Sequence, residues 1–410
     1  MLDIKFIRQN PEKVKEGLAK KQADVDIDRL LILDGERREI QQKIESLRFE
    51  QGKLGKDDIA KAQEIKAEIK TREPELANLN KELDALLRKI PNLPLDEVPF
   101  GKDDSENVVM REEGKKPKFD FQPRDYMEIG QNLDIIDTER AAKVAGTRFG
   151  YLKGEAAMLE FALINLAMET LAKEDFIPVV PPVMLKPEMM EGMGYVERGA
   201  DEIYYLEKDK LYLAGTAEQS IGAMHANETF EERDLPRRYV GFSTCFRREA
   251  GAYGKDTKGI LRVHQFDKIE MFSFCHPDKS KEEHEFLLKT EEKLMKLLGI
   301  PYHVLRICSG DLGDPAAAKY DLEAWLPGQN QYRETHSASN CTDYQARRLN
   351  IKYRDSKTKK PEFVHTLNGT AFAIGRTLIA IIENYQQKDG SVLVPKVLQK
   401  YVGFKQIKKN

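Results

Sequence analysis

Charged and aromatic side chains alternate within residues 245–272, where one strand-like run ends in "CFRREAG" and a second reads "RVHQFDKIEMF". Side chains of a strand point to its two faces in turn, with a period of two residues. One face shared by the two runs is therefore predicted to carry Arg247, Glu249, Arg262, His264, Phe266, Lys268 and Glu270. The opposite face receives Arg248 from the first run and Val263 from the second.

These residue types suit a nucleotide and a small polar substrate. Paired arginines can bind phosphate oxygens bidentately, and a phenylalanine can stack on a base. Glutamates accept hydrogen bonds from amines and hydroxyls, and they can also bind a metal ion. An exposed strand face with salt-bridged charges is the alternative, and the segment alone leaves both interpretations open.

A second candidate anion site lies in "LNGTAFAIGRTLIAIIENYQ", residues 367–386. A strand of small residues runs into an apolar helix, and Arg376 stands at the helix start. Helix N-termini attract anions through their free N–H groups and the helix dipole. Arg376 could therefore bind a terminal phosphate, although a solvated arginine at an ordinary helix start is the alternative.

The elements that must position these residues form a mixed pattern without a regular β-α-β rhythm. Amphipathic helices are predicted over 155–174, 279–298 and 376–387. Alternating strands are predicted over 211–213, 239–247, 262–274 and 321–326. Short links between the strands favour an α+β fold, with an antiparallel sheet flanked by helices.

The N-terminal region has a different period. Residues 27–54 carry apolar side chains three and four residues apart, and the pattern resumes over 62–90 after the break "GKDD" at 55–58. Two such seams predict an antiparallel helical coiled-coil arm over about 27–90. Pro74 should kink the second helix or split it. We therefore predict an N-terminal domain at 1–105, a linker at 106–125 and a catalytic domain at 126–410.

Composition narrows the functional classes. The 410 residues have a net charge of −3, so no global basic field indicates nucleic acid, although RNA could still bind a local surface. We expect no DNA partner. There is no apolar run of 18 residues, so no membrane span is expected. The four cysteines form no C-x-x-C pair, which suits a reducing cytoplasm and argues against a cysteine-only zinc site.

Taken together, these segments resemble a class II aminoacyl-tRNA synthetase, most closely the seryl-tRNA synthetase family in its common bacterial-type branch. The resemblance covers the whole chain in the family's order. The matching segments are "DFIPVVPP" (175–182), "AGTAEQS" (214–220), "FRREAG…RVHQFDKIE", "RETHSASNCTDYQARR" (333–348) and "GTAFAIGRTLIAIIENYQ". Asp175 stands where the family usually has glycine.

The resemblance implies ATP-dependent formation of seryl-adenylate. The seryl group then passes to the 3′-terminal adenosine of serine tRNA, with selenocysteine tRNA as a further candidate substrate. Arg247 should hold the α-phosphate and the serine carboxylate, and Arg376 the γ-phosphate. The further ATP-binding residues that it implies are Arg248, Glu249, Arg262, Val263, Phe266, Glu334, Thr335, His336 and Ser337.

The family also implies a metal ion and an amino-acid pocket. Glu334 and Ser337 should hold Mg²⁺. Cys308, Glu334 and Cys341 resemble the zinc site of a rarer branch, but the arm and the T-A-E loop belong to the common branch, so zinc is not expected. The serine-binding residues that it implies are Thr216, Ala217, Glu218, Arg247, Glu270, Asn368 and Thr370.

The implied partners are L-serine, serine tRNA on the helical arm, and a second copy of the chain, bound through residues 175–182. Three rival interpretations remain. A related ligase that loads carrier proteins would lack the long arm. A catalytically inactive paralogue would lose motif residues such as Arg247 and Glu334. A coiled-coil scaffold would leave the charged strand face unexplained.

Overall fold

The computed structural model describes residues 1–55, 57–250 and 258–409. The chain forms two compact units, Met1–Leu93 and Pro94–Asn410. The predicted domain boundaries at 105 and 125 remain predictions. Within the predicted linker, Val108–Glu113 form strand β1, which pairs with β11 (Tyr302–Arg306) of the second unit.

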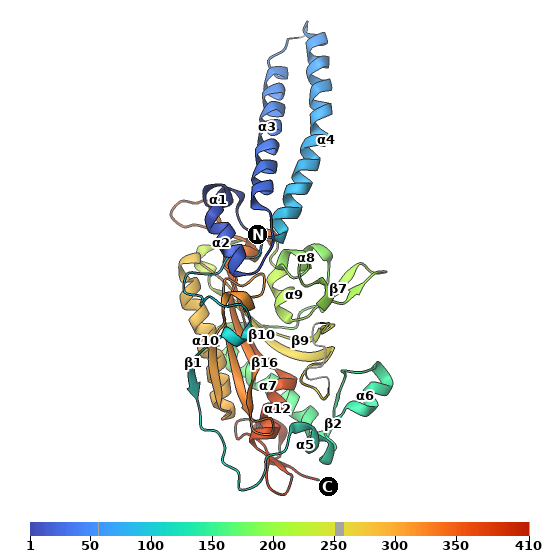
Figure 1. The fold of residues 1–410 in the computed structure, drawn as a ribbon, viewed down its shortest axis with the longest axis vertical. Helices are drawn as coiled ribbons and strands as arrows, with labels where there is room; N and C mark the ends of the chain where they lie inside the picture. The colour runs from blue at the N-terminus through green and yellow to red at the C-terminus, as the bar shows by residue number, and fades with distance from the viewer. Residues whose placement is uncertain (56, 251–257, 410) are drawn as a thin grey trace. The chain divides into compact units, whose positions relative to one another are not determined.

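The first unit consists of helices. Two short helices, α1 (Ile4–Gln9) and α2 (Pro11–Lys20), precede the long helices α3 (Ile27–Gln51) and α4 (Ile59–Lys89), which run antiparallel as predicted (Figure 1). Helix α4 continues through Pro74, so the proline does not split this helix, and the alternative that it kinks the helix stays a prediction.

Two apolar clusters stabilise the arm formed by α3 and α4. One cluster joins the base of the arm to α1 and α2, through side chains such as Ile7, Val14 and Leu30. The second lies further along the arm, where Ile44 and Leu47 of α3 meet Ile65 and Ile69 of α4. These residues follow the three-and-four spacing of the sequence, which gives each helix one apolar stripe.

The second unit is built on a sheet that has eight strands among the described residues. Its neighbouring strands are antiparallel, except for the parallel pair β4 and β9. This arrangement confirms the predicted α+β fold with a largely antiparallel sheet. In spatial order the strands are β1, β11, β12 (Ala318–Leu326), β13 (Gln331–Asn340), β16 (His365–Ala373), β10 (Gln265–Cys275), β9 (Arg237–Phe246) and β4 (Phe176–Val179).

Edge strand β4 begins directly after Asp175, the position at which the resemblance led us to expect glycine. Asp175 has a φ of 61°, in the left-handed region that glycine adopts most easily. Aspartate is among the residues best tolerated there. The local turn is therefore made in spite of the different residue.

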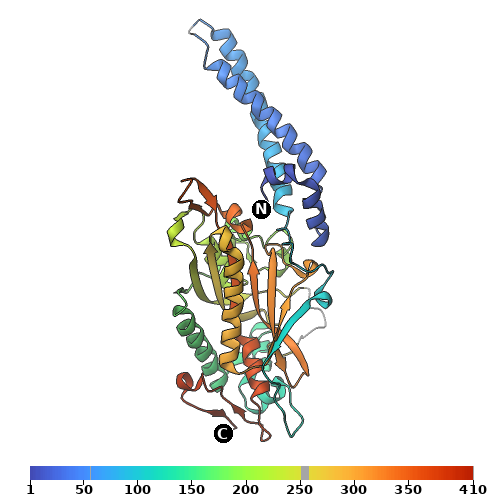
Figure 2. The same ribbon diagram turned by 90° about the vertical axis from the view of Figure 1, so that its left-hand side faces the viewer.

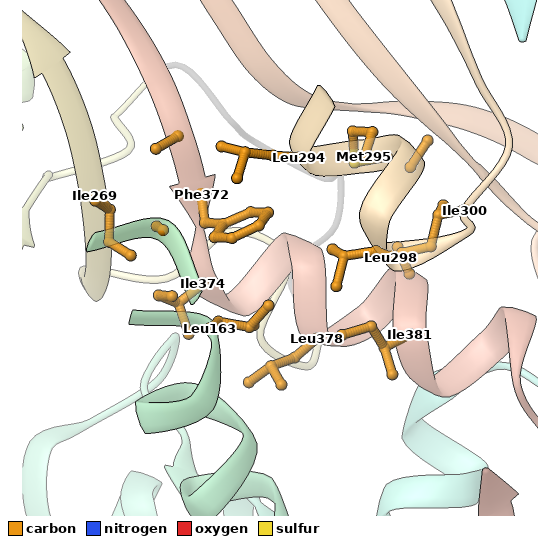
Figure 3. Packing of buried hydrophobic residues seen from close by; sticks show 14 of the residues in the cluster. Leu163, Ile269, Leu294, Met295, Leu298, Ile300, Phe372, Ile374, Leu378 and Ile381 are labelled. Carbon is orange, nitrogen blue, oxygen red and sulfur yellow. The ribbon is translucent and has the colours of Figure 1, made fainter. Parts of the chain in front are cut away.

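Three predicted helices supply the main core: α7 (Gly154–Ala172), α10 (Ser280–Leu298) and α12 (Ile374–Asn384). Helix α10 lies along one face of the sheet (Figure 2). Leu163, Leu294 and Leu378 of these helices converge with Ile269 of β10 and Phe372 of β16 (Figure 3). On its opposite face, β10 places Phe272 and Phe274 in a second cluster, so this central strand is covered on both sides.

The remaining elements are short. The helices are α5 (Tyr126–Asn132), α6 (Thr138–Ala145), α8 (Pro187–Met193), α9 (Ala217–Ala223), α11 (Tyr344–Leu349) and α13 (Gln399–Val402). The strands are β2 (Ile136–Asp137), β3 (Tyr151–Leu152), β5 (Met184–Leu185), β6 (Tyr205–Leu206), β7 (Leu211–Leu213), β8 (Thr229–Glu231), β14 (Lys352–Arg354), β15 (Pro361–Phe363), β17 (Val392–Leu393) and β18 (Gln406–Ile407). Among the described residues, none of the helices has the length and apolar character needed to span a membrane.

Candidate active site

One cavity of about 590 Å³ gathers most of the residues singled out in the sequence. Its lining residues lie between Tyr195 and Arg376, all within the second unit. Of the predicted residues, Ala217, Arg248, Glu270 and His336 are not among those that line it. The predicted residues that do are Thr216, Glu218, Arg247, Glu249, Arg262, Val263, Phe266, Glu334, Thr335, Ser337, Asn368, Thr370 and Arg376.

The charged strand face is shorter than the alternation predicts. Strand β9 ends at Phe246 and β10 begins at Gln265, so Arg262 and Val263 precede the strand, and both line the cavity. The predicted alternation of side chains between the two faces therefore does not apply to residues before Gln265. It does apply from Phe266 to Glu270, which lie within β10. Residues 250–261, between the two runs, were predicted to form a glycine-bearing loop, and 251–257 of them lie outside the described residues.

The side chains of the neighbouring Arg247 and Arg248 make different contacts, as the alternation predicts. The Nε of Arg247 donates to the carbonyl of Gly215 at 3.1 Å, and its guanidinium lies 5.2 Å from the centre of the Phe266 ring. Arg248 instead donates to the carbonyl of Ile203 at 3.1 Å and lies over the ring of Tyr204. Only Arg247 lines the cavity, so the implied ATP contact of the Arg248 side chain is not supported by its position.

Backbone contacts fix the segment that carries these arginines. The amide of Arg247 donates to the carbonyl of His264 at 3.0 Å, and His264 Nδ1 contacts the Arg247 carbonyl at the same distance. Glu249 has a φ of 51°, and its carbonyl accepts a hydrogen bond from Arg148 at 2.8 Å. His264 thus has a structural role, holding the two chain segments together.

A β-bulge in β13 brings two consecutive residues of this strand to the cavity. Leu322 of β12 pairs with His336 and Glu323 pairs with Glu334, which leaves Thr335 as the extra residue. Glu334, Thr335 and Ser337 consequently all line the cavity. His336 is buried beside Phe372, and burial lowers its pKa to about 4, so its ring is neutral and belongs to the core.

Cations dominate one part of the cavity wall. Arg376, in the first turn of α12, donates to the backbone carbonyl and the carboxylate of Glu334 at 3.0 and 3.1 Å. Removal of water from Glu334 opposes its ionisation, but Arg376 and Lys319 outweigh this and lower its pKa to about 2. Arg247 also acts on the Glu334 carboxylate, and Arg262 lines the same cavity, so the cavity can neutralise a polyphosphate.

A second β-bulge lies in β16, the strand that contributes Asn368 and Thr370 to the cavity lining. Ile269 of β10 pairs with Phe372 of β16 and Glu270 pairs with Thr370, so Ala371 is the extra residue. Thr370 and Asn368 line the cavity beside this bulge. Glu270 is fully buried and lies 2.5 Å from the ammonium of Lys268, which does line the cavity.

Helix α9 adds a further carboxylate. The hydroxyl of Thr216 caps the helix by accepting from the amide of Glu218 at 3.4 Å. Buried Glu218 accepts hydrogen bonds from the hydroxyl of Tyr195 and from the amide of Asn368. Ala217 is buried in the apolar cluster beneath the helix, so its side chain contributes packing.

Burial and a neighbouring carboxylate make Glu270 costly to ionise. Burial raises the pKa of Glu270 to about 7, and the nearby Glu218 adds to this increase, while the Lys268 ammonium opposes it. A carboxyl with this pKa can accept a proton or bind an ammonium group near neutral pH.

The cavity is also lined by polar residues that were not predicted as site residues. They include Tyr195, Lys268 and Lys319, besides Glu202, Gln219 and Ser339. Lys268 was on the predicted charged face but received no role. Lys319 forms a 2.9 Å ion pair with Asp321 on β12, and Tyr195 precedes α9 in a loop. Neither Tyr195 nor Lys319 stands in a chemical pattern that the sequence reveals.

The residues considered for zinc do not gather in one place. Glu334 and Cys341 line the cavity. The thiol of Cys308 instead donates to the carbonyl of Asp103 at 3.2 Å. Within residues 1–55, 57–250 and 258–409, there is no cluster of three or more His, Cys, Asp or Glu residues that could hold a metal ion.

Comparisons with known proteins place this cavity in a family. A family profile described as "Seryl-tRNA synthetase N-terminal domain" matches residues 1–94. A second, "tRNA synthetase class II core domain (G, H, P, S and T)", matches residues 204–385 and so includes most of the residues that line the cavity. The Serine--tRNA ligase of Thermobifida fusca is 47% identical, covering 98% of each chain. That of Thermococcus onnurineus is 46% identical, covering 99% of this chain and 97% of its relative.

Solved structures agree. The seryl-tRNA synthetase of Pyrococcus horikoshii, complexed with ATP, is 44% identical and superposes with a TM-score of 0.94 over 100% of both chains. The cytoplasmic serine-tRNA ligase of Naegleria fowleri, in complex with AMP, is 38% identical with a TM-score of 0.92, covering 100% of this chain and 99% of its own. The chain belongs to the seryl-tRNA synthetase family of class II aminoacyl-tRNA synthetases.

Proposed function

We propose that the cavity activates L-serine with ATP to form seryl-adenylate, and then transfers the seryl group to the 3′-terminal adenosine of serine tRNA. The observation that carries this proposal is a single cavity whose lining has two parts: the cations Arg247, Arg262, Arg376 and Lys319, and the buried polar side chains of Thr216, Glu218, Asn368 and Thr370. The first part suits a triphosphate and the second suits an amino acid. The full-length similarity to serine–tRNA ligases agrees with this chemistry.

Activation is an in-line attack of the serine carboxylate on the α-phosphorus, which needs alignment and charge neutralisation. Arg247 holds the α-phosphate and the serine carboxylate, because it is the motif arginine that faces the cavity. Arg376 and Arg262 bind the outer phosphates. Phe266 stacks on the adenine, and Glu249 accepts its amino group.

The Mg²⁺ site consists of Glu334 and Ser337. Both side chains carry oxygen, the ligand that Mg²⁺ prefers, and both line the cavity. The low pKa of Glu334 keeps its carboxylate available to a cation. When bound, the ion neutralises phosphate charge. Arg376 already contacts Glu334, so it and the metal ligands adjoin the same phosphates.

The serine pocket consists of Glu218, Glu270, Asn368, Thr370 and Thr216. The two buried carboxylates receive the ammonium and hydroxyl of serine. A pocket built to pair with a hydroxyl rejects alanine strongly, because alanine leaves buried polar groups without partners. Glu270 itself does not line the cavity, but the ammonium of Lys268, which does, contacts its carboxylate.

The expected partners follow from two surfaces. We propose that the helical arm binds serine tRNA and that a second copy of the chain docks at α7 and β4. Phe161 of α7, Ile177 of β4 and the nearby Val180 are large apolar side chains with exposed fractions of 59%, 43% and 82%. Apolar exposure of this extent is typical of an interface. Sedimentation of the purified protein tests the dimer.

We also propose a cytoplasmic location. Cys245, Cys275, Cys308 and Cys341 are buried free thiols. Burial raises the pKa of Cys245 to about 12, so this cysteine stays protonated and unreactive. Free buried thiols suit a reducing compartment.

Two assays test the proposed function as a whole. Serine-dependent ATP–pyrophosphate exchange measures the first step, and charging of serine tRNA with radiolabelled serine measures both. Activity in both assays is expected. A protein that catalyses exchange but charges a carrier protein, or one that catalyses neither reaction, would contradict the proposal.

Replacing Glu270 with alanine is expected to impair the use of serine rather than of ATP. Loss of a buried charge-assisted hydrogen bond costs ~2–3 kcal/mol, which corresponds to about a hundredfold increase in KM for serine. KM for ATP should change less than about threefold, since Glu270 pairs with Thr370 on the serine side. Separate titrations of serine and ATP measure this, and a defect confined to ATP would show that the pocket assignment is wrong.

The raised pKa of Glu270 also predicts a pH dependence. Below its pKa of about 7 the carboxyl is protonated, and it then lacks the charge that binds the serine ammonium. At saturating ATP, kcat/KM for serine should be maximal above this pH and fall about tenfold per pH unit well below it. Glu270→Gln should have lower activity and a flat profile over the same range. An unchanged inflection in Glu270→Gln would mean that another group titrates.

A further inference from the structure

One aromatic side chain of the arm takes no part in packing the two helices together. The cluster along the arm contains Ile44 and Leu47 of α3 with Ile65 and Ile69 of α4. Phe49, two residues before the end of α3, is 65% exposed and lies outside that cluster. Arm packing therefore does not explain a phenylalanine at this position.

A cation lies over the exposed ring. The ammonium of Lys53 is 4.0 Å from the centre of the Phe49 ring. Residues three and four positions before Phe49 on the same helical face are Ser46 and Glu45, so the ring's sequence neighbours on this face are polar. A protein-docking surface would need a contiguous apolar patch. A single aromatic ring beside a cation instead suits a planar, anionic ligand.

We propose that Phe49 and Lys53 form a stacking site for an unpaired base of the bound tRNA. Proteins commonly recognise RNA by stacking splayed-out bases on aromatic side chains, and an adjacent lysine can contact the phosphate of the same nucleotide. This inference rests on the proposed function, in which the arm binds serine tRNA. It adds a specific nucleotide-binding site to the arm.

Direct tRNA binding at fixed salt tests the site. Phe49→Ala should raise the Kd for serine tRNA about tenfold, within the range found for base–aromatic stacking. Phe49→Trp should bind at least as tightly as the wild type, whereas Phe49→Leu should resemble Phe49→Ala. Ile32→Ala is the matched control, because Ile32 is a 54% exposed apolar residue on the same helix that has no aromatic ring to stack on a base. Serine-dependent pyrophosphate exchange should be unchanged in all four variants.

Two further readouts separate stacking from a general effect. Phe49→Ala should leave the slope of log Kd against log salt unchanged. Lys53→Ala should reduce this slope by about one, because one fewer counterion is released when the tRNA binds. The chain has one tryptophan, so Phe49→Trp in a Trp325→Phe background gives a single reporter. Its fluorescence should be quenched when tRNA binds.

Several outcomes would overturn the inference. One is a Kd for serine tRNA that is unchanged in Phe49→Ala, and another is wild-type affinity in Phe49→Leu. A third is a sedimentation coefficient that differs between Phe49→Ala and the wild type, because Phe49 would then be a contact between copies of the chain. If the wild-type protein binds no serine tRNA, the proposed function itself fails. If the wild type binds and Phe49→Ala binds equally well, only the stacking site fails.

Discussion

Replacing Arg247 with alanine is expected to lower the rate of serine-dependent ATP–pyrophosphate exchange at least about a hundredfold. Arg247 faces the cavity, and the carbonyl of Gly215 and the ring of Phe266 hold its guanidinium in place. A preorganised donor to the charge that develops at the reacting phosphate contributes ~3–4 kcal/mol to transition-state stabilisation. The loss should therefore appear mainly in kcat, measured at saturating serine and ATP.

Arg248→Ala is the matched control. This variant removes an arginine side chain from the neighbouring position. Arg248 contacts Ile203 and Tyr204, however, and does not line the cavity. Its exchange rate should stay within about threefold of the wild type, since the lost contacts lie outside the transition state. Exchange by Arg247→Ala within that same range, or equal losses in both variants, would contradict the role of Arg247.

Shortening the arm is expected to separate the two steps of the reaction. The cluster at the arm's base packs against α1 and α2, so a deletion should leave that base intact. Removing residues 38–77 and joining the ends with a short glycine-rich linker meets this requirement. Pyrophosphate exchange should stay within about threefold of the wild type, because the residues that line the cavity all come from the second unit.

Charging of tRNA by the shortened protein should behave differently. Its kcat/KM for serine tRNA should fall at least about a hundredfold, or ~2.7 kcal/mol, because most of the proposed RNA-binding surface is gone. Circular dichroism and sedimentation show whether the remaining protein is folded and has its normal assembly state. If charging survives, the arm does not bind the tRNA. If exchange is also lost in a folded protein, the arm supports the active site.

Periodicity in the sequence was enough to predict the large elements. The seam of residues 27–54 became α3, and the predicted helices at 155–174, 279–298 and 376–387 became α7, α10 and α12 with small shifts at their ends. Long amphipathic helices repeat their signal over many turns, so a single unusual residue has little effect. Pro74 shows this, because α4 continues through it.

Short-range irregularities escaped the same reasoning. Strict alternation placed Arg262 within a strand that begins only at Gln265. The extra residues Thr335 and Ala371 interrupt the alternation in β13 and β16. A bulge depends on how two distant strands pair, and one strand's sequence does not contain that information. The same is true of Lys319 and Tyr195, which reach the cavity through tertiary packing.

A crystal structure with a non-hydrolysable seryl-adenylate analogue tests the central claim most directly, since this ligand would occupy both parts of the cavity at once. The account predicts the adenine on Phe266, the phosphate-mimicking group at Arg247, and the seryl ammonium within hydrogen-bonding distance of Glu218 or Glu270. Binding outside the cavity would contradict it, as would an ammonium group placed on the wall that carries Arg376 and Glu334.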